Sequence, residues 1–149
     1  MLEFIGLALT AILVPFAALG DEKKGLEQLQ AGDAFFKKGD FKGAQETYLA
    51  ALQADPDLEP AYLGCAEARR RLEEPDAALE ILNQGLEKLP RSARLLLAAA
   101  AIFEELQRFE SAAAFYERIL AGPSASPGAR AALGLLRLRQ GNLAAAIGR

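Results

Sequence analysis

The chain has 149 residues and a formal net charge of −3, and 25% of its residues are charged. This weakly acidic balance argues against a nucleic-acid binder, which needs a dense basic patch. The sequence contains no histidine and one cysteine, Cys65, which excludes a histidine-activated nucleophile and an internal disulfide. Alanine, leucine, glutamate and arginine dominate, and this composition favours helix almost throughout.

The N-terminal segment 1–20, MLEFIGLALTAILVPFAALG, is apolar, and its residues 4–19 carry no charge. As a helix, twenty residues span about 30 Å, the thickness of a bilayer core. Lys23 and Lys24 follow it and no basic residue precedes it, so we expect a membrane anchor with the rest of the chain in the cytoplasm. A cleaved signal peptide, leaving a periplasmic or secreted protein, is the alternative, because small residues near residue 20 suit cleavage. A buried core helix is a third interpretation.

The remaining sequence repeats itself with a period of 34 residues, so that a shift by one period carries Ala44 onto Ala78 and Pro56 onto Pro90. Small, apolar, aromatic and proline positions return together, which chance matches in an alanine-rich chain rarely achieve. The sets at successive periods are Ala44, Ala78, Ala112 and Ala146; Leu52, Leu86 and Leu120; and Pro56 and Pro90, while Phe35 and Phe103, and Tyr48 and Tyr116, match at twice the period. A strict period of this length predicts a stack of helix pairs rather than a generic helix bundle.

The first unit predicts two helices that approach closely. Gly32 and Ala44 are small enough to let the helices meet, and Phe35 and Tyr48 are expected to fill the contact between them. The apolar residues recur at helical spacing on either side. One such pair cannot bury its apolar face alone, so the units are expected to stack.

Turn and cap residues mark the ends of these helices. Gly39 is expected to end the first helix, and Asp40 to cap the second. Pro56 is expected to end the pair. In the next unit Pro75 is expected to start the second helix, where proline is tolerated in the first turn.

This pattern resembles the tetratricopeptide repeat, a helix–turn–helix unit of about 34 residues with small residues at two places, an aromatic residue in each helix and a terminal proline. The resemblance implies an all-α fold, a right-handed superhelical solenoid of antiparallel helix pairs behind one apolar N-terminal helix. A domain at 21–149 would hold repeats at 25–58, 59–92 and 93–126 and a partial repeat at 127–149 that stops inside its second helix. The early aromatic of the family is weak here, its place being held by Gln28, Tyr62 and Leu96.

The resemblance also implies a concave groove lined by the first helix of each unit, which suits an extended segment or a helix of a protein partner. Family members that bind chaperones clamp a peptide's C-terminal carboxylate with lysine, arginine and asparagine in this groove. At those places this chain has leucine, alanine and two acids, so we expect no such clamp. The residues that the resemblance places in the groove are Leu29, Asp33, Phe36, Lys37, Leu63, Glu67, Arg70, Arg71, Leu97, Ala101, Glu104 and Glu105.

The sequence predicts no catalytic, cofactor or metal site. Cys65 lies in a first helix at a packing position, so we expect a buried structural thiol. The adjacent acids Glu104 and Glu105 do not share a helix face, which argues against a metal site. The stretch GPSASPG at 122–128 lacks the lysine of a phosphate-binding loop and is interpreted as the turn before the fourth unit.

We therefore expect a non-catalytic protein-interaction scaffold, tethered to a membrane through residues 1–20, without a cofactor or a nucleic-acid partner. The alternatives are an adaptor released by signal cleavage and the non-catalytic arm of a longer enzyme. The last unit lacks the polar face of a terminal repeat, which predicts a contact with another subunit there or a chain that continues. The apolar residues offered at this edge are Leu133, Leu136, Leu143 and Ile147.

Overall fold

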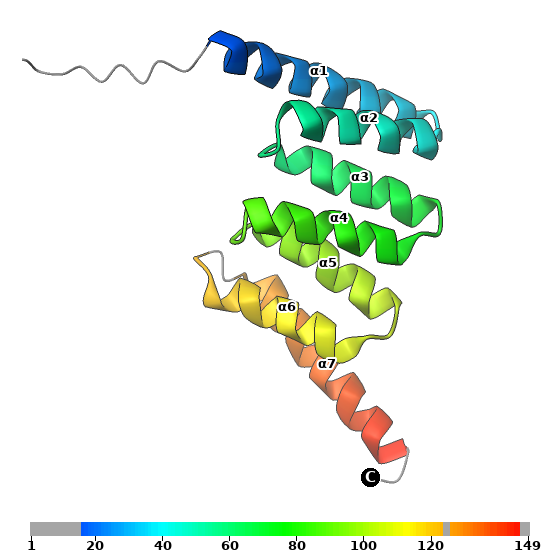
Figure 1. The fold of residues 1–149 in the computed structure, drawn as a ribbon. Coiled ribbons are helices and arrows are strands. Elements are labelled where there is room, and N and C mark those ends of the chain that lie inside the picture. Colours follow the sequence, from blue (N-terminus) through cyan, green and yellow to red (C-terminus); the bar gives the residue numbers. More distant parts are fainter. Residues whose placement is uncertain (1–15, 124–125, 147–149) are drawn as a thin grey trace, which may run out of the picture.

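The computed structural model describes residues 16–123 and 126–146, which form seven α-helices and no strand. The helices stack as antiparallel pairs along one direction (Figure 1). The all-helical solenoid expected from the period is therefore confirmed. The helices are α1 (Phe16–Lys37), α2 (Phe41–Ala54), α3 (Glu59–Arg71), α4 (Pro75–Lys88), α5 (Ala93–Glu105), α6 (Phe109–Ala121) and α7 (Pro127–Ala146).

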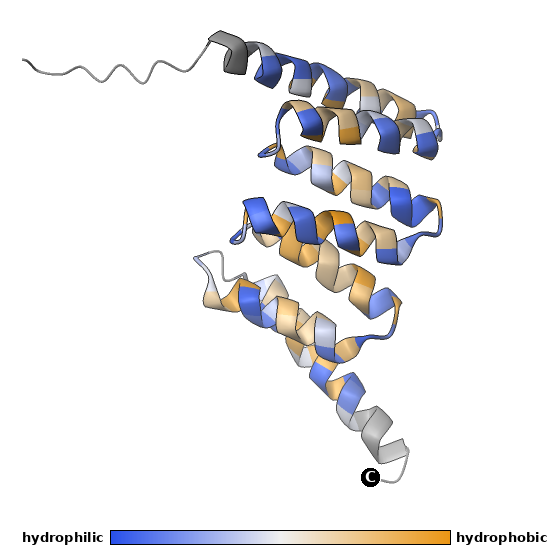
Figure 2. Ribbon diagram, in the orientation of Figure 1, coloured by the Kyte–Doolittle hydropathy of each residue, from blue (hydrophilic) through white to orange (hydrophobic). Residues whose placement is uncertain are grey.

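Each helix packs mainly on its neighbours in the sequence, and the first helices of successive pairs also meet. α1 contacts α2 and α3, and α3 contacts α5 as well as α2 and α4. The turns inside the pairs lie along one edge of the stack, whereas the loops between pairs lie along the other (Figure 1). Hydrophobic residues concentrate in α4, α5 and α6, while the described part of α1 is mostly hydrophilic (Figure 2).

The turn inside each pair has the same backbone conformation three times. Gly39 has φ +80°, as its predicted role as a helix terminator requires, and Glu73 and Gln107 have φ 61° and 56°. Successive positions of this set are one repeat period apart. The following amide closes each turn, as where the Arg108 N–H donates to the Phe103 carbonyl at 2.8 Å. The turn thus repeats even where the glycine does not.

The predicted caps are confirmed. The Asp40 Oδ1 accepts a hydrogen bond of 2.9 Å from the Gly43 N–H at the start of α2, and Pro75 is the first residue of α4. Ser92 adds a cap on α5, where its Oγ accepts from the Leu95 N–H at 3.1 Å. Each cap satisfies an amide that the helix itself leaves unpaired.

The small residues of the first unit make room for one aromatic ring. Tyr48 is only 2% exposed, and it lies against two glycines of successive first helices. A Cβ on Gly32 would come within 2.7 Å of the Tyr48 ring, and one on Gly64 within 2.5 Å. The predicted close approach at Gly32 is therefore confirmed. Phe35 does not share the buried contact, because 39% of it stays exposed, and that part of the prediction is wrong.

The first and last helices are longer than the repeat predicts. α1 begins at Phe16 and continues without a break through residues 20–25 into the first unit, where the exposed Lys23 and Glu27 approach to 3.9 Å. α7 runs through Gly141, which lies three repeat periods after Gly39, and so enters the stretch expected to form the second helix of the partial repeat. A glycine inside a helix costs only about 1 kcal/mol relative to alanine, so continuing the helix preserves its backbone hydrogen bonds at little cost.

The C-terminal apolar edge also differs from the prediction. Leu133 and Leu136 are 7% and 1% exposed, because their spacing places both on the face of α7 that packs on α6. Among the described side chains of this helix, the exposed leucines are instead Leu135 and Leu138. The side chains of residues 143 and 147, also expected at this edge, lie outside the described part.

The predicted membrane segment falls almost entirely outside the described residues. Within residues 16–123 and 126–146, no helix combines the length and the apolar character needed to cross a bilayer.

Candidate functional site

The first helices of the stack present one continuous surface, which we call the first-helix face. It consists of the twelve side chains expected in the groove, together with three exposed residues of α7. On α1 these are Leu29, Asp33, Phe36 and Lys37; on α3, Leu63, Glu67, Arg70 and Arg71; on α5, Leu97, Ala101, Glu104 and Glu105; and on α7, Leu135, Leu138 and Arg139.

Leucines form an apolar row along this face. Leu29 and Leu63 are half-buried and pack against the core. Leu97, one repeat period after Leu63, is 40% exposed. Ala101, one helical turn further along α5, is also exposed. The apolar surface open to solvent therefore grows from the first pair of helices towards the third.

Aromatic and cationic groups link α1 to α3. The Phe36 ring packs edge-on against Phe41, with ring centroids 5.1 Å apart. The Arg71 guanidinium lies 5.8 Å from the centroid of Phe36 and 5.7 Å from that of Phe41. Such cation–π contacts contribute about 0.5–1 kcal/mol at exposed sites. Lys37, the last residue of α1, is exposed beside them.

Ion pairs link α3 to α5. Arg70 donates to both oxygens of Glu105, through Nη2 at 2.6 Å and Nε at 3.2 Å. Its Nη1 also donates to Glu67 Oε2 at 2.6 Å, and Arg71 Nε donates to Glu67 Oε1 at 3.0 Å. The charged side chains of the second and third helix pairs therefore neutralise one another across the surface. Bidentate arginine–carboxylate contacts of this kind fix geometry as well as charge.

Two acids of the face accept hydrogen bonds from buried tyrosines. The Tyr48 hydroxyl donates to Asp33 Oδ1 at 2.6 Å, and the Tyr116 hydroxyl donates to Glu104 Oε1 at 2.6 Å. Burial first, and then the neighbouring carboxylate, raise the pKa of Tyr48, and the same causes raise the pKa of Tyr116 to about 12. The tyrosines stay neutral and anchor the two carboxylates to the core.

The face is hollowed between α5 and α7. A cavity of about 360 Å³ is lined by Ala101, Glu104, Glu105 and Arg139. Arg139 Nη1 lies 4.0 Å from Glu104 Oε2, which extends the charge pairing to the fourth first helix. Ten of the twelve predicted side chains thus lie either in the leucine row or in the cation–π contacts, ion pairs and hydrogen bonds described above. The other two, Ala101 and Lys37, are exposed beside them.

Sequence reasoning left out the contribution of α7. Leu135 and Leu138 are 63% and 64% exposed, and Arg139 lines the cavity. A signal existed, because a shift of one repeat period carries Ala101, Glu104 and Glu105 onto these three positions. The sequence prediction named Leu133 and Leu136 of this helix instead, and both are buried.

Cys65 is confirmed as a buried thiol with no exposed surface. Burial raises its pKa, although the nearby Arg69 opposes this shift. Arg69 itself is turned to the helix contact, where its Nη1 donates to the Ala77 carbonyl at 3.0 Å. Within the described residues, no group of cysteine, aspartate and glutamate side chains is arranged to hold a metal ion.

Comparison with known sequences agrees with the repeat. A tetratricopeptide repeat family model matches residues 35–102. Tetratricopeptide repeat protein 8 of Mus musculus is 30% identical over 93 residues, which cover 62% of this chain and 18% of that protein. The chain therefore spans less than a fifth of the curated relative that it matches.

Solved structures share the fold. The first TPR of Spaghetti (RPAP3), bound to an HSP90 peptide, is similar with a TM-score of 0.70 and 23% identity, covering 80% of this chain and 95% of that one. PcrH in complex with the chaperone binding region of PopD is similar with a TM-score of 0.66 and 24% identity, covering 79% and 95%. Both likenesses place the described helices in the same helical repeat fold.

Proposed function

We propose that this chain, whose residues 35–102 match the tetratricopeptide repeat family model, is a non-catalytic scaffold that binds a segment of a protein partner on its first-helix face. The observation that carries the proposal is the continuity of this face, whose side chains contact one another from α1 to α7. The similar structures of the Spaghetti repeat and of PcrH hold an HSP90 peptide and a region of PopD respectively. Repeats of this kind generally act as interaction modules.

The chemistry of the face favours an apolar segment over a charged chain terminus. Arg70 is already paired with Glu67 and Glu105, so a partner's carboxylate would have to displace these acids. The exposed surface of Leu97 and Ala101 offers contact area without such a cost. The partner we propose is an internal extended segment or helix whose apolar side chains lie along the leucine row.

A matched pair of alanines tests this assignment. Ala101 on α5 and Ala114 on α6 are both exposed helix residues, but only Ala101 lies on the first-helix face. We expect Ala101→Arg to lower recovery of the main partner about tenfold, which corresponds to about 1.4 kcal/mol, in pull-downs read by quantitative mass spectrometry. Ala114→Arg should retain it. Equal recovery with both variants would place binding elsewhere.

The location of the scaffold is a further part of the proposal. The uncharged stretch 4–19, followed by Lys23 and Lys24, supports a membrane tether with the repeats in the cytoplasm. An adaptor released by signal cleavage, or the arm of a longer enzyme, would share the same face. Fractionation with an alkaline wash separates a tether from a released protein, because a spanning helix stays with the membrane and a peripheral chain is washed off.

A further inference from the structure

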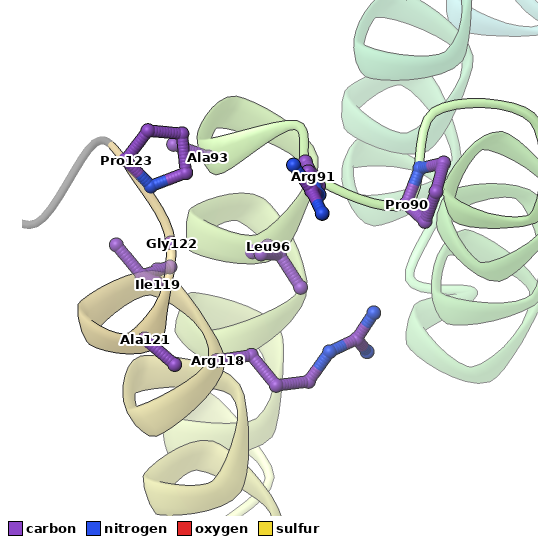
Figure 3. A pocket seen from close by; sticks show the side chains of 9 residues that line it. All are labelled: Pro90, Arg91, Ala93, Leu96, Arg118, Ile119, Ala121, Gly122 and Pro123. Atoms are coloured by element: carbon purple, nitrogen blue, oxygen red, sulfur yellow. The ribbon is translucent and has the colours of Figure 1, made fainter.

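A second cavity lies at the edge of the stack that carries the loops between helix pairs. Its volume is about 220 Å³, and no residue of the first-helix face lines it. The α4–α5 loop, the start of α5 and the end of α6 surround it (Figure 3). The lining residues are Pro90, Arg91, Ala93, Leu96, Arg118, Ile119, Ala121, Gly122 and Pro123.

The corresponding place one unit earlier is filled by an aromatic ring. Tyr62, one repeat period before Leu96, is buried, and its ring lies against Gly85, where a Cβ would come within 2.9 Å. Its hydroxyl donates to the Pro56 carbonyl at 2.8 Å. In the third unit Leu96 supplies neither ring nor hydroxyl. Ile119, which stands where Gly85 does, fills part of the space, and the cavity is what remains.

The charge of the lining also changes between the two units. Arg91 stands where Asp57 does, and Arg118 where Gln84 does, and no acid is among the residues that line the cavity. The ion pairs formed among the described side chains include neither arginine. Arg118 lies 5.2 Å from the Phe115 ring centroid and extends past Leu96 towards the side where Pro90 and Arg91 lie (Figure 3).

We propose that this cavity is a second binding site, which takes an aromatic side chain from an acidic segment of a partner protein. The ring would enter beside Leu96 and Ile119, as the Tyr62 ring does within the chain. A neighbouring carboxylate would lie between Arg91 and Arg118, whose guanidiniums suit it in charge and geometry. The volume is below the about 300–1,000 Å³ of small-molecule pockets, so it fits one side chain. Recognition of a lipid surface uses clusters of about 4–8 basic residues, more than this hollow site offers.

Amide shifts in the isotope-labelled full chain test the site, with three capped peptides as probes. These are acetyl-AFEEA-amide, the glutamine analogue acetyl-AFQQA-amide, and acetyl-AAEEA-amide, which lacks the ring. We expect the first peptide to shift the amides of Arg91, Leu96, Arg118 and Ile119. Replacing either its acids or its ring should weaken binding about tenfold.

Variants of the chain separate the two parts of the site. Arg91→Ala with Arg118→Ala should weaken the acidic peptide about tenfold, whereas Arg94→Ala, an exposed arginine of α5 outside the lining, should leave it unchanged. Leu96→Tyr with Ile119→Gly rebuilds the filled arrangement of the preceding unit and should abolish binding while the helical spectrum is retained.

Three outcomes would overturn the proposal. They are equal affinity for the acidic and glutamine peptides, shifts confined to the first-helix face, and binding to phosphatidylglycerol vesicles without binding to the peptide. The second of these would leave the proposed scaffold function intact, because that function uses a different surface. Unchanged recovery of the partner with Ala101→Arg, conversely, would count against the scaffold function and leave the second site untouched.

Discussion

At each turn inside a helix pair, one residue has a left-handed backbone, and only the first of these residues is a glycine. Glu73 and Gln107 have φ 61° and 56° in the places that correspond to Gly39. An ordinary side chain in this region costs about 1–2 kcal/mol. The turns keep their shape because the amide that follows bonds back to the end of the preceding helix, as between Glu74 N and Arg69 O at 2.9 Å.

Replacing Gln107 with glycine should therefore stabilise the protein. We expect Gln107→Gly to raise the free energy of unfolding by about 0.5–1 kcal/mol, since relief of strain exceeds the extra freedom that glycine gives the unfolded chain. The measurement is urea unfolding followed by circular dichroism. The matched control is Gln84→Gly, at an exposed position inside α4, which should lose about 1 kcal/mol. A loss at both positions would contradict the turn geometry.

The three tyrosines of the chain, Tyr48, Tyr62 and Tyr116, all lie in the core. Burial is the main cause that raises the pKa of each, and the acids nearby add to it. A pKa raised in the folded state means that the unfolded chain loses its proton first. The free energy of unfolding should therefore fall as the pH rises through the ordinary tyrosine value of about 10 towards about 12, the pKa of Tyr116.

Ultraviolet absorbance of tyrosinate checks this dependence. In buffer the absorbance should rise only at pH values well above 10, at the same pH at which the helical signal is lost. In concentrated guanidinium, where the chain is unfolded, the absorbance should rise near pH 10. Tyr116→Phe removes one buried phenol and should make the alkaline fall in stability shallower. A folded protein whose tyrosines titrate near pH 10 would argue against buried, acid-paired hydroxyls.

At the scale of the helix, α3 is joined to α5 by a two-point ion pair. Arg70 contacts both oxygens of Glu105, whereas the exposed pair of Arg108 and Asp76 has one contact of 3.2 Å. Exposed pairs contribute about 0–1 kcal/mol, and bidentate geometry places a pair at the upper end of that range. The first pair should therefore couple its two helices more strongly than the second.

Double-mutant cycles with alanine measure both couplings. We expect about 0.5–1 kcal/mol between Arg70 and Glu105, and less than about 0.5 kcal/mol between Arg108 and Asp76. Added salt should reduce the first coupling only in part, because Arg70 is half-buried. If the two cycles gave equal values, the two-contact geometry at Arg70 would add no coupling between the helices.

The sequence predicted those features of the helices that depend on local chemistry or on the period. The helix ends are marked by the backbone or side-chain properties of Gly39, Asp40 and Pro75. The burial of Tyr48 follows from the small residues around its ring. The prediction failed where the burial of a side chain or the end of a helix depends on the elements packed beside it. Phe35 stays exposed, because burial depends on what packs beside the turn, and α7 passes through Gly141.

The site was predictable to the same extent. The family resemblance places twelve residues of the first-helix face at corresponding positions of three first helices, but it does not say that Arg70 turns to Glu105 rather than to solvent. The edge cavity needed the structure, because it arises from the joint exchange of Tyr62 for Leu96 and Gly85 for Ile119. Either exchange alone is an ordinary variation of a helix contact.

Over the whole molecule, each described helix contacts chiefly its neighbours along the stack. α3 packs against α1, α2, α4 and α5, whereas the main partner of α7 is α6. In a stack of this kind, stability is nearly a sum of units and of interfaces between neighbours, so the ends can open while the middle stays folded. Among the described side chains of α7, those of Ala129, Leu133 and Leu136 are buried.

Amide hydrogen exchange should therefore show a gradient, with the strongest protection in α3 to α5 and weaker protection in α7. Leu136→Ala removes a side chain that is 1% exposed, which costs about 2–5 kcal/mol in a packed core. We expect it to speed exchange in α7 and α6 and to leave α3 unchanged. Leu138→Ala, at a position that is 64% exposed in the same helix, is the matched control and should change little. Exchange that rose equally in every helix after Leu136→Ala would mean that the stack opens as a single cooperative unit.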